Sequence, residues 1–245
     1  MGLFLLASIV VFRPEDYLDL SCCEHASLFD GVRQVWEVFS KLAVYLQFHL
    51  HSEMRGKVTG DAYIGNQVFV GEGTTIAPGA CITGPAIIGK NCRIGCGVHL
   101  RENVVLGDDV MVGTACELKN SIVLDGAEIA HLNYVGDSLL GHKAHLGAGA
   151  VLSNFRFDHS PVTVFIGGGE KIATGLEKFG AVVGDHAQVG CNSVVSPGSF
   201  IGRNAWIYPC TSWRGVLPEG HIARSQEAAS VIPNQKKKKE GLQDE

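Results

Sequence analysis

The residues with the clearest chemical potential lie in one stretch, positions 128–156, with the sequence EIAHLNYVGDSLLGHKAHLGAGAVLSNFR. His131, Tyr134 and Asn154 stand there among closely spaced glycines and aliphatic residues. An imidazole has an ordinary pKa of about 6.5, so it can accept and release a proton near neutral pH. We therefore predict that this stretch carries the chemistry and that the flanking segments hold it in place.

An aliphatic side chain recurs at every sixth position on the N-terminal side of this stretch. The series is Ile64, Val70, Ile76, Ile82, Ile88, Ile94, Leu100, Leu106, Val112, Leu118 and Leu124. Such a hexapeptide repeat is typical of a parallel β-helix, in which six residues form a short strand and a turn and three units complete a triangular coil. We predict an all-β, left-handed parallel β-helix with its aliphatic side chains stacked inward. Gly is abundant, at 31 residues, which suits a tight turn in every unit.

The repeat is interrupted twice. The frame slips near residues 125–135 and resumes from Leu140 to Leu152. Residues 153–182 then fit no coil, and the frame returns at Val183. Because the stacking continues beyond this insertion, the insertion must leave the prism as a loop or hairpin, and long loops of this kind often serve function.

The two ends of the chain differ from the repeat. Residues 1–55 are predicted to form a helical N-terminal segment, residues 56–223 the β-helix, and residues 224–245 a basic, flexible tail. Asp30 precedes a run whose apolar residues share one helical face. These residues are Val32, Val35, Trp36, Phe39, Leu42, Ala43 and Leu46. We expect this helix to pack on the rest of the chain or on a neighbouring subunit.

Composition excludes several classes of protein. A net charge of -5 with 18% charged residues does not suggest a nucleic-acid-binding protein. The eight cysteines form no CxxC pair, so a zinc ribbon is not expected. We expect them instead to be buried thiols in a reducing cytosol. The first twelve residues are apolar but lack a basic start and are too short to span a bilayer, so we expect neither a signal peptide nor a membrane anchor.

Residues 94–223 resemble the C-terminal β-helix domain of the bifunctional sugar-1-phosphate nucleotidylyltransferase/acetyltransferases, and the archaeal-type enzymes above all. The matching segments are HLNYVGDSLLG, LGAGAVLSNFRFD and KFGAVVGDHAQVGCNSVVSPGSFIG. They include residues that break the repeat as well as the repeat itself. Residues 1–55 are too short for the family's nucleotidylyltransferase domain and carry no Gly-rich nucleotide loop, so we expect the acetyltransferase part alone.

The resemblance implies a catalytic set. His131 matches the family's general base, which would accept a proton from the attacking amine. Glu117 matches a position near that base, where a carboxylate would orient the imidazole or bind the amino sugar. Asn154 matches an active-site amide that follows the last coil before the insertion.

The resemblance also implies binding residues. Arg101 and Lys119 match the residues that hold the sugar 1-phosphate, and their spacing of one coil would stack them as a phosphate clamp. Tyr134 matches a substrate-binding tyrosine. Ala148 and Cys191 match positions that face acetyl-CoA, with the Ala148 backbone at the thioester.

The sequence departs from the family at several of these positions. His145 stands where the bacterial relatives have a substrate-binding Asn, and Phe155 replaces their Tyr. Ser160 and Thr163 stand where the archaeal-type relatives have lysines that would suit the phosphates of CoA. These changes put the identity of the sugar and the affinity for CoA in question.

The sequence as a whole predicts an acetyl-CoA-dependent N-acetyltransferase of an aminosugar 1-phosphate that is cytoplasmic and needs no metal. We expect a homotrimer with clefts between subunits, because a short prism cannot bury its flat faces alone.

Two alternatives stay open. The first is a zinc carbonic anhydrase, for which the histidines His142, His145, His159 and His186 have the wrong spacing. The second is a non-catalytic module that trimerises or regulates a partner nucleotidylyltransferase.

Overall fold

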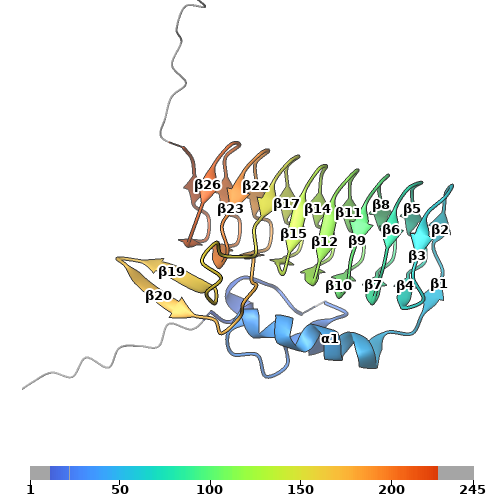
Figure 1. The fold of residues 1–245 in the computed structure, drawn as a ribbon, viewed down its shortest axis with the longest axis horizontal. Helices are drawn as coiled ribbons and strands as arrows, with labels where there is room; N and C mark the ends of the chain where they lie inside the picture. The colour runs from blue at the N-terminus through green and yellow to red at the C-terminus, as the bar shows by residue number, and fades with distance from the viewer. Residues whose placement is uncertain (1–11, 22, 226–245) are drawn as a thin grey trace, which may run out of the picture.

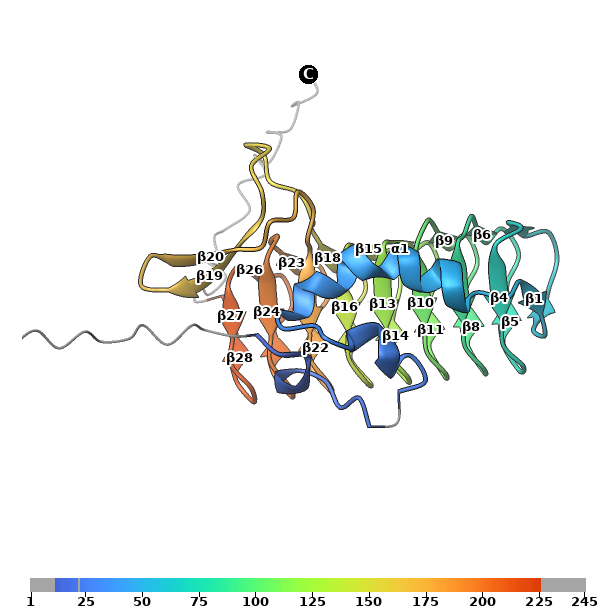
Figure 2. The same cartoon turned by 90° about the horizontal axis from the view of Figure 1, so that it is seen from below.

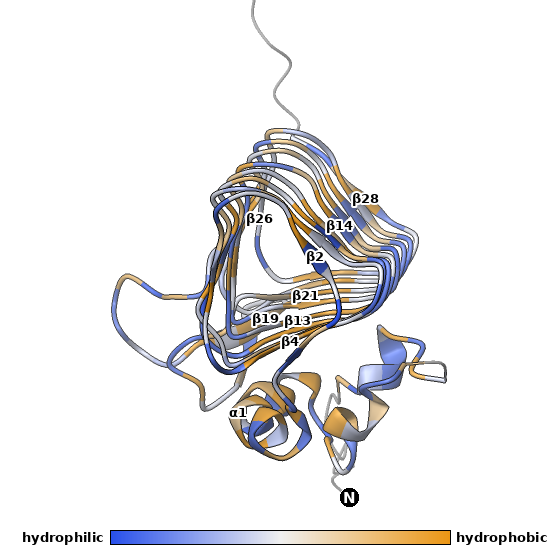
Figure 3. Cartoon of the chain, turned by 90° about the vertical axis from the view of Figure 1, so that its right-hand side faces the viewer, coloured by the Kyte–Doolittle hydropathy of each residue, from blue (hydrophilic) through white to orange (hydrophobic). Residues whose placement is uncertain are grey.

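The computed structural model describes residues 12–21 and 23–225, which form a triangular prism of stacked coils (Figures 1 and 3). Each complete coil adds one short strand to each of three parallel sheets. The predicted left-handed parallel β-helix is therefore confirmed.

The three sheets form the faces of the prism. The first face holds β1 (Glu53–Met54), β4 (Val68–Val70), β7 (Ala86–Ile88), β10 (Val104–Leu106), β13 (Ser121–Val123), β16 (Leu139–Leu140), β21 (Ala181–Val183), β24 (Ser199–Ile201) and β27 (Val216–Leu217). The second face holds β2 (Lys57–Val58), β5 (Thr75–Ile76), β8 (Arg93–Ile94), β11 (Met111–Val112), β14 (Glu128–Ile129), β17 (His145–Leu146), β22 (Gln188–Val189), β25 (Trp206–Ile207) and β28 (Ile222–Ala223). The third face holds β3 (Tyr63–Ile64), β6 (Cys81–Ile82), β9 (His99–Leu100), β12 (Glu117–Lys119), β15 (Tyr134–Gly136), β18 (Val151–Leu152), β23 (Val194–Val195) and β26 (Ser212–Trp213).

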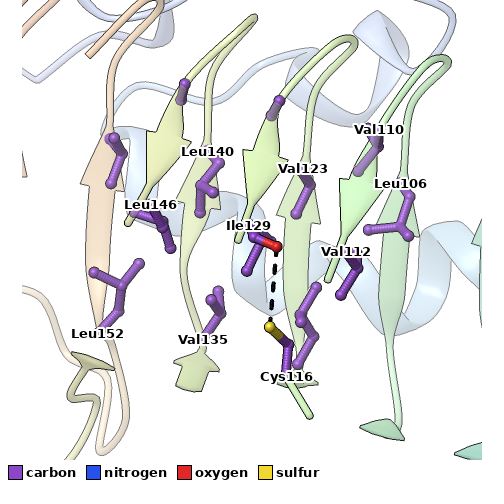
Figure 4. Close-up of a cluster of buried hydrophobic side chains, with 14 of the residues drawn as sticks. Leu106, Val110, Val112, Cys116, Val123, Ile129, Val135, Leu140, Leu146 and Leu152 are labelled. Atoms are coloured by element: carbon purple, nitrogen blue, oxygen red, sulfur yellow. Dashed lines mark hydrogen bonds between the residues drawn. The ribbon is translucent and has the colours of Figure 1, made fainter. Parts of the chain in front are cut away.

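The aliphatic residues of the repeat point into the prism and stack between coils (Figure 4). Ile88 pairs with Leu106, and Leu106 pairs with Val123, in the parallel register of the first face. All three side chains are fully buried. Full burial of such a side chain contributes about 1.5–3 kcal/mol, so the columns are the main source of stability in the prism.

The inward series does not continue at Leu124, and that part of the prediction is wrong. Val123 takes the inward place, five residues after Leu118, and Leu124 instead packs in the cluster outside the first face. A second five-residue step separates Val135 from Leu140. Both short steps fall at the corner between the third and first faces, which we call the 3–1 corner.

The two short steps are turned by residues in the left-handed region. Asn120 and Asp137 each have φ of 46°. Asn and Asp adopt this conformation more readily than other non-glycine residues because their short side chains can hydrogen-bond locally. Both shortened corners are thus turned by residue types suited to this conformation.

The N-terminal segment covers the first face (Figures 2 and 3). It comprises η1 (Pro14–Asp16), η2 (Ala26–Phe29), η3 (Val35–Glu37) and the helix α1 (Val38–His49). Trp36, Phe39 and Leu42 pack in one apolar cluster with outward residues of that face such as Val105 and Ile122. The expectation that the helix packs on the rest of the chain is confirmed, although α1 begins only at Val38. The apolar residues 1–11 lie outside the described residues.

Asp185 joins this segment to the prism. Its carboxylate accepts the backbone N–H of Asp19 at 2.6 Å and that of His142 at 2.8 Å. The guanidinium Nε of Arg203 lies 3.8 Å away. Asp185 is almost fully buried, so the two backbone donors and the nearby guanidinium compensate its charge, and loss of either hydrogen bond would leave the carboxylate poorly solvated.

The insertion leaves the prism after β18 and forms an antiparallel hairpin, β19 (Thr163–Gly167) with β20 (Glu170–Ala173). The hairpin projects from the C-terminal half of the prism (Figure 1). Val162, Val164 and Phe179 at its base are fully buried. The predicted excursion from the prism is thus observed, and its base is anchored.

The predicted tail falls almost entirely on residues 226–245, which lie outside the described residues. Within the described ranges, no helix is long and apolar enough to cross a membrane.

The inward columns lead to a test of the register. Ile88→Asp would place an unpaired carboxylate in the dry core, at a cost of several kcal/mol. For a domain of this size we expect the melting temperature to fall by roughly 10 °C or more, or soluble protein to be lost. Thr75→Asp, on an exposed outward position of β5, is the matched control and should melt near wild type. A Ile88→Asp variant that melts within a few degrees of wild type would show that the register is wrong.

Candidate active site

Most of the predicted site residues lie on the third face or at its two edges. Glu117 pairs with Tyr134 across β12 and β15, so their side chains stand in one outward column. Arg101, Lys119 and Asn154 lie at the 3–1 corner. His131, Ala148 and Cys191 lie at the opposite edge, between the second and third faces, which we call the 2–3 corner.

The 2–3 corner stacks three predicted residues in one column. Ile129 pairs with Leu146, and Leu146 pairs with Val189, in the second face. His131, Ala148 and Cys191 each follow those strands by two residues, so they occupy equivalent places in successive coils. Backbone hydrogen bonds tie the coils together here, with Asn192 N–H donating to the Ala148 carbonyl at 2.9 Å. The amides of Ala148 and Cys191 donate to no acceptor among the described residues.

His131 is exposed, and its ring has one hydrogen-bond partner among the described residues. Its Nδ1 accepts the backbone N–H of Thr114 at 3.3 Å, at the long end of the range for such bonds. A neutral imidazole that accepts at Nδ1 carries its hydrogen on Nε2. To accept a proton from a substrate, the ring must turn about Cβ–Cγ or give up this weak contact.

The 3–1 corner gathers four predicted residues around one pocket of about 290 Å³. Its lining residues are Arg101, Lys119, Tyr134, Asn154, Phe155 and Lys178. Leu100 pairs with Leu118 across β9 and β12, so Arg101 and Lys119, one residue later, stack as expected.

Asp137 lies behind this pocket and organises it. Its carboxylate accepts Nδ2 of Asn120 at 2.8 Å and also accepts Nδ2 of Asn154. The ammonium of Lys119 lies 3.8 Å from the same carboxylate. Asp137 is only 4% exposed, so its charge is compensated by these donors and not by water. The buried carboxylate thereby fixes the positions of the amide and the ammonium.

Carboxylates also hold the two stacked cations. Glu102 lies 3.5 Å from Arg101 and 3.7 Å from Lys119. Burial alone would raise the pKa of Glu102, but its own backbone N–H and these two cations together lower it. Arg101 also donates to Glu117 at 3.0 Å. Among the described residues Glu117 thus pairs with Arg101, and no hydrogen bond joins it to His131.

Tyr134 closes over Gly136. A Cβ atom on Gly136 would lie 2.6 Å from both the Tyr134 hydroxyl and Nδ2 of Asn154, so a side chain there would displace both polar groups. Burial, and then the Asp137 carboxylate, raises the pKa of Tyr134, which keeps the phenol protonated and able to donate.

His145 lies on the second face, away from both corners of the third face. Its Nδ1 is 3.3 Å from Glu128, in a cavity of about 450 Å³ that Lys143 and Gln188 also line. Within one chain it therefore does not join the other predicted residues. No group of three or more His, Cys, Asp or Glu side chains in the described part of the chain could hold a metal ion.

Three site residues were missed from the sequence. Asp137 and Glu102 are the carboxylates of the 3–1 corner. Lys178 reaches the pocket from the end of the insertion, where its backbone pairs with Phe155. The signal for Asp137 was the frame slip itself, because the residue that turns a shortened corner must face its neighbours in adjacent coils. Ser160 and Thr163 are not among the residues that line the pocket.

Sequence comparisons place the chain among known proteins. Residues 82–175 match the model of the GMPPB C-terminal domain. The bifunctional protein GlmU of Methanococcus aeolicus is 36% identical over 179 residues, covering 73% of this chain and 43% of that protein. A putative uncharacterized acetyltransferase of Escherichia coli, YaiX, is 37% identical over 161 residues, covering 66% of this chain and 70% of that protein. The chain spans less than half the length of the bifunctional relatives.

Solved structures were also compared. AntD, an N-acyltransferase from Bacillus cereus, shares 15% identity at a TM-score of 0.32, covering 74% of this chain and 84% of that chain. The UDP-N-acetylglucosamine acyltransferase of Francisella novicida shares 17% identity at a TM-score of 0.32, covering 65% of this chain and 59% of that chain. The family assignment rests on the sequence relatives, and on that basis the chain belongs to the hexapeptide-repeat acyltransferase family that contains the β-helix part of the GlmU-type bifunctional enzymes.

Proposed function

We propose that the protein transfers an acetyl group from acetyl-CoA to the amine of an aminosugar 1-phosphate. The observation that carries the proposal is the pocket at the 3–1 corner, where Arg101, Lys119 and Lys178 converge beside Tyr134 and Asn154. A strong cluster of cations in a concave site suits a phosphate, and the neighbouring phenol and amide suit the hydroxyls of a sugar.

The phosphate would be bound by exchange of partners. Without a ligand, Glu102 bridges Arg101 and Lys119 and balances their charge. Lys178 is exposed and has no carboxylate within 4.0 Å in the described part of the chain. A phosphate dianion would take the place of the Glu102 contacts, and Lys178 would supply the additional positive charge.

The acyl transfer would take place toward the 2–3 corner. The amine nitrogen attacks the thioester carbon, the C–N bond forms, and the C–S bond breaks. His131 takes the proton from the amine and returns it to the departing sulfur of CoA. The N–H of Ala148, which has no acceptor among the described residues, would bind the oxyanion that forms on the thioester.

A trimer would complete this site. α1 covers the first face. Among the described residues, no further helix or strand of this chain packs over the outer side of the second or third face. We propose that the second face of one prism meets the third face of the next. His145 would then approach the substrate from a neighbouring subunit, which accounts for its distance from the other residues within one chain.

A second candidate function is an assembly module for a partner nucleotidylyltransferase. It is favoured by the match of residues 82–175 to a C-terminal domain. It gives no role to the aligned column of His131, Ala148 and Cys191, and the two proposals differ in every catalytic assay.

The phosphate clamp is tested by charge removal. Arg101→Gln and Lys119→Met each remove one cation while keeping the side-chain bulk. Because a hydrogen bond to a charged group contributes about 1.5–3 kcal/mol, the Michaelis constant for glucosamine 1-phosphate should rise roughly 10- to 100-fold. The Michaelis constant for free glucosamine should hardly change. Arg33→Gln, an exposed cation on the N-terminal segment, is the control. Equal effects on both substrates would remove the clamp from this account.

The role of His131 is tested by thiol release from acetyl-CoA. His131→Ala should lower turnover by roughly 10²–10⁴-fold, the usual contribution of a positioned general base. The melting temperature and the affinity for acetyl-CoA should stay unchanged, because the ring is exposed and its one hydrogen bond among the described residues is the weak one from the Thr114 amide. His221→Ala, an exposed histidine in the last coil, should behave as wild type.

The same assay separates the enzyme from the module. Wild-type release no faster than buffer, with glucosamine and galactosamine 1-phosphates, would favour the module. Full activity in His131→Ala would keep the acyltransferase but exclude its proposed base.

A further inference from the structure

A second cavity of about 470 Å³ adjoins the pocket at the 3–1 corner, and Phe155 borders both. It lies between the start of the insertion and the C-terminal coils of the third face. Its lining residues are Ser153, Phe155, Arg156, Phe157, Asp158, Val194, Ser196, Pro197 and Arg214. The acyl transfer proposed above assigns no role to this cavity.

The cavity presents aromatic rings that the fold does not use. The side chain of Phe157 is wholly exposed, at 101% of its reference area, and Phe155 is 37% exposed. The Phe155 ring is held edge-on to His159 with the ring centroids 5.0 Å apart. Both rings border the same cavity, where they offer a ligand an apolar surface. Such rings are the usual platforms for nucleobases.

The cavity also carries positive charge. Arg214 is exposed, lies 5.6 Å from the Phe165 ring centroid, and has no carboxylate within 4.0 Å in the described part of the chain. Arg156 is held by Asp158 through Nε at 3.0 Å and Nη2 at 2.6 Å. A guanidinium has five N–H donors, so Arg156 retains donors for a ligand after this pairing. Asp158 is the one acidic residue in the lining.

We propose that this cavity binds the nucleoside end of the acceptor, so that the preferred acceptor is a nucleoside diphosphate-linked aminosugar. This inference rests on the proposed acyl transfer and refines its substrate. The phosphate on the sugar would lie with Arg101, Lys119 and Lys178. The diphosphate of the ligand would pass Phe155. Its second phosphate, the one next to the nucleoside, would face Arg214, and the base would stack on Phe157.

The lining favours a nucleotide over a simple apolar group. Two arginines and two serine hydroxyls would be left unused by an acyl chain, and desolvating them without partners would be unfavourable. A ligand with a flat aromatic base, hydroxyls and a phosphate uses all of them. The nucleotide of CoA has the same chemistry, and the two sources of nucleotide are separated by kinetics.

The experiment compares kcat/KM for UDP-, GDP- and dTDP-linked glucosamine with that for glucosamine 1-phosphate, at saturating acetyl-CoA. We expect at least one nucleotide-linked acceptor to be preferred by roughly tenfold or more, because stacking of one base contributes a factor of about 5 to 100. Phe157→Ala and Arg214→Gln should each remove most of that preference and leave kcat/KM for glucosamine 1-phosphate unchanged. Phe48→Ala, an exposed aromatic on α1 that lines neither cavity, is the matched control.

Each of the other outcomes also decides whether the cavity binds the nucleoside of the acceptor. Equal kcat/KM for nucleotide-linked and free sugar phosphates would overturn the inference and leave the acyl transfer standing. A raised Michaelis constant for acetyl-CoA in Phe157→Ala, with the acceptor constants unchanged, would assign the cavity to CoA and also overturn it. If no acceptor is acetylated, the proposed function fails, and calorimetric titration with UDP, GDP and dTDP decides the cavity. Binding that is lost in Phe157→Ala would support the nucleotide site, and no binding would overturn it.

Discussion

The geometry of the site depends on the buried carboxylate of Asp137. Removing a charge from water is costly, so the carboxylate must be surrounded by donors, and it finds them in adjacent coils. Asn120 from the preceding coil and Asn154 from the following coil both donate to it, and Lys119 lies beside it. One interaction therefore locks three coils at the 3–1 corner and sets the amide and ammonium groups that face the pocket.

The rest of the fold keeps that corner fixed and accessible. The inward columns set the spacing between coils, so residues one coil apart stack without further help. Within one chain the N-terminal helix covers the first face and leaves the third face and its corners uncovered. The insertion begins at Asn154 and ends at Lys178, and its buried base returns that lysine to the pocket where the chain left it. Rigid scaffold and functional loop thus meet at the same corner.

The six-residue periodicity was sufficient to predict the fold, because each aliphatic position has one inward direction in a prism. It failed at Leu124, because the deletion of one residue at a corner shifts every later residue and leaves no change in composition. The stacking of Arg101 on Lys119 could be predicted from their spacing alone. The frame slip marks the region of Asp137 but does not single out the residue, since a Gly-Asp pair is also an ordinary turn. The distance of His145 from the pocket depends on which face its strand joins, which follows only from the register.

The central claim is that the 3–1 corner binds the phosphate of the acceptor. A crystal structure of the protein with glucosamine 1-phosphate tests it most directly. The account predicts phosphate density in contact with Arg101, Lys119 and Lys178, with the Glu102 carboxylate moved away from both stacked cations. The sugar should lie against Tyr134 and Asn154. Phosphate bound elsewhere on the prism, or a vacant corner at saturating ligand with Glu102 still bridging the cations, would contradict the account.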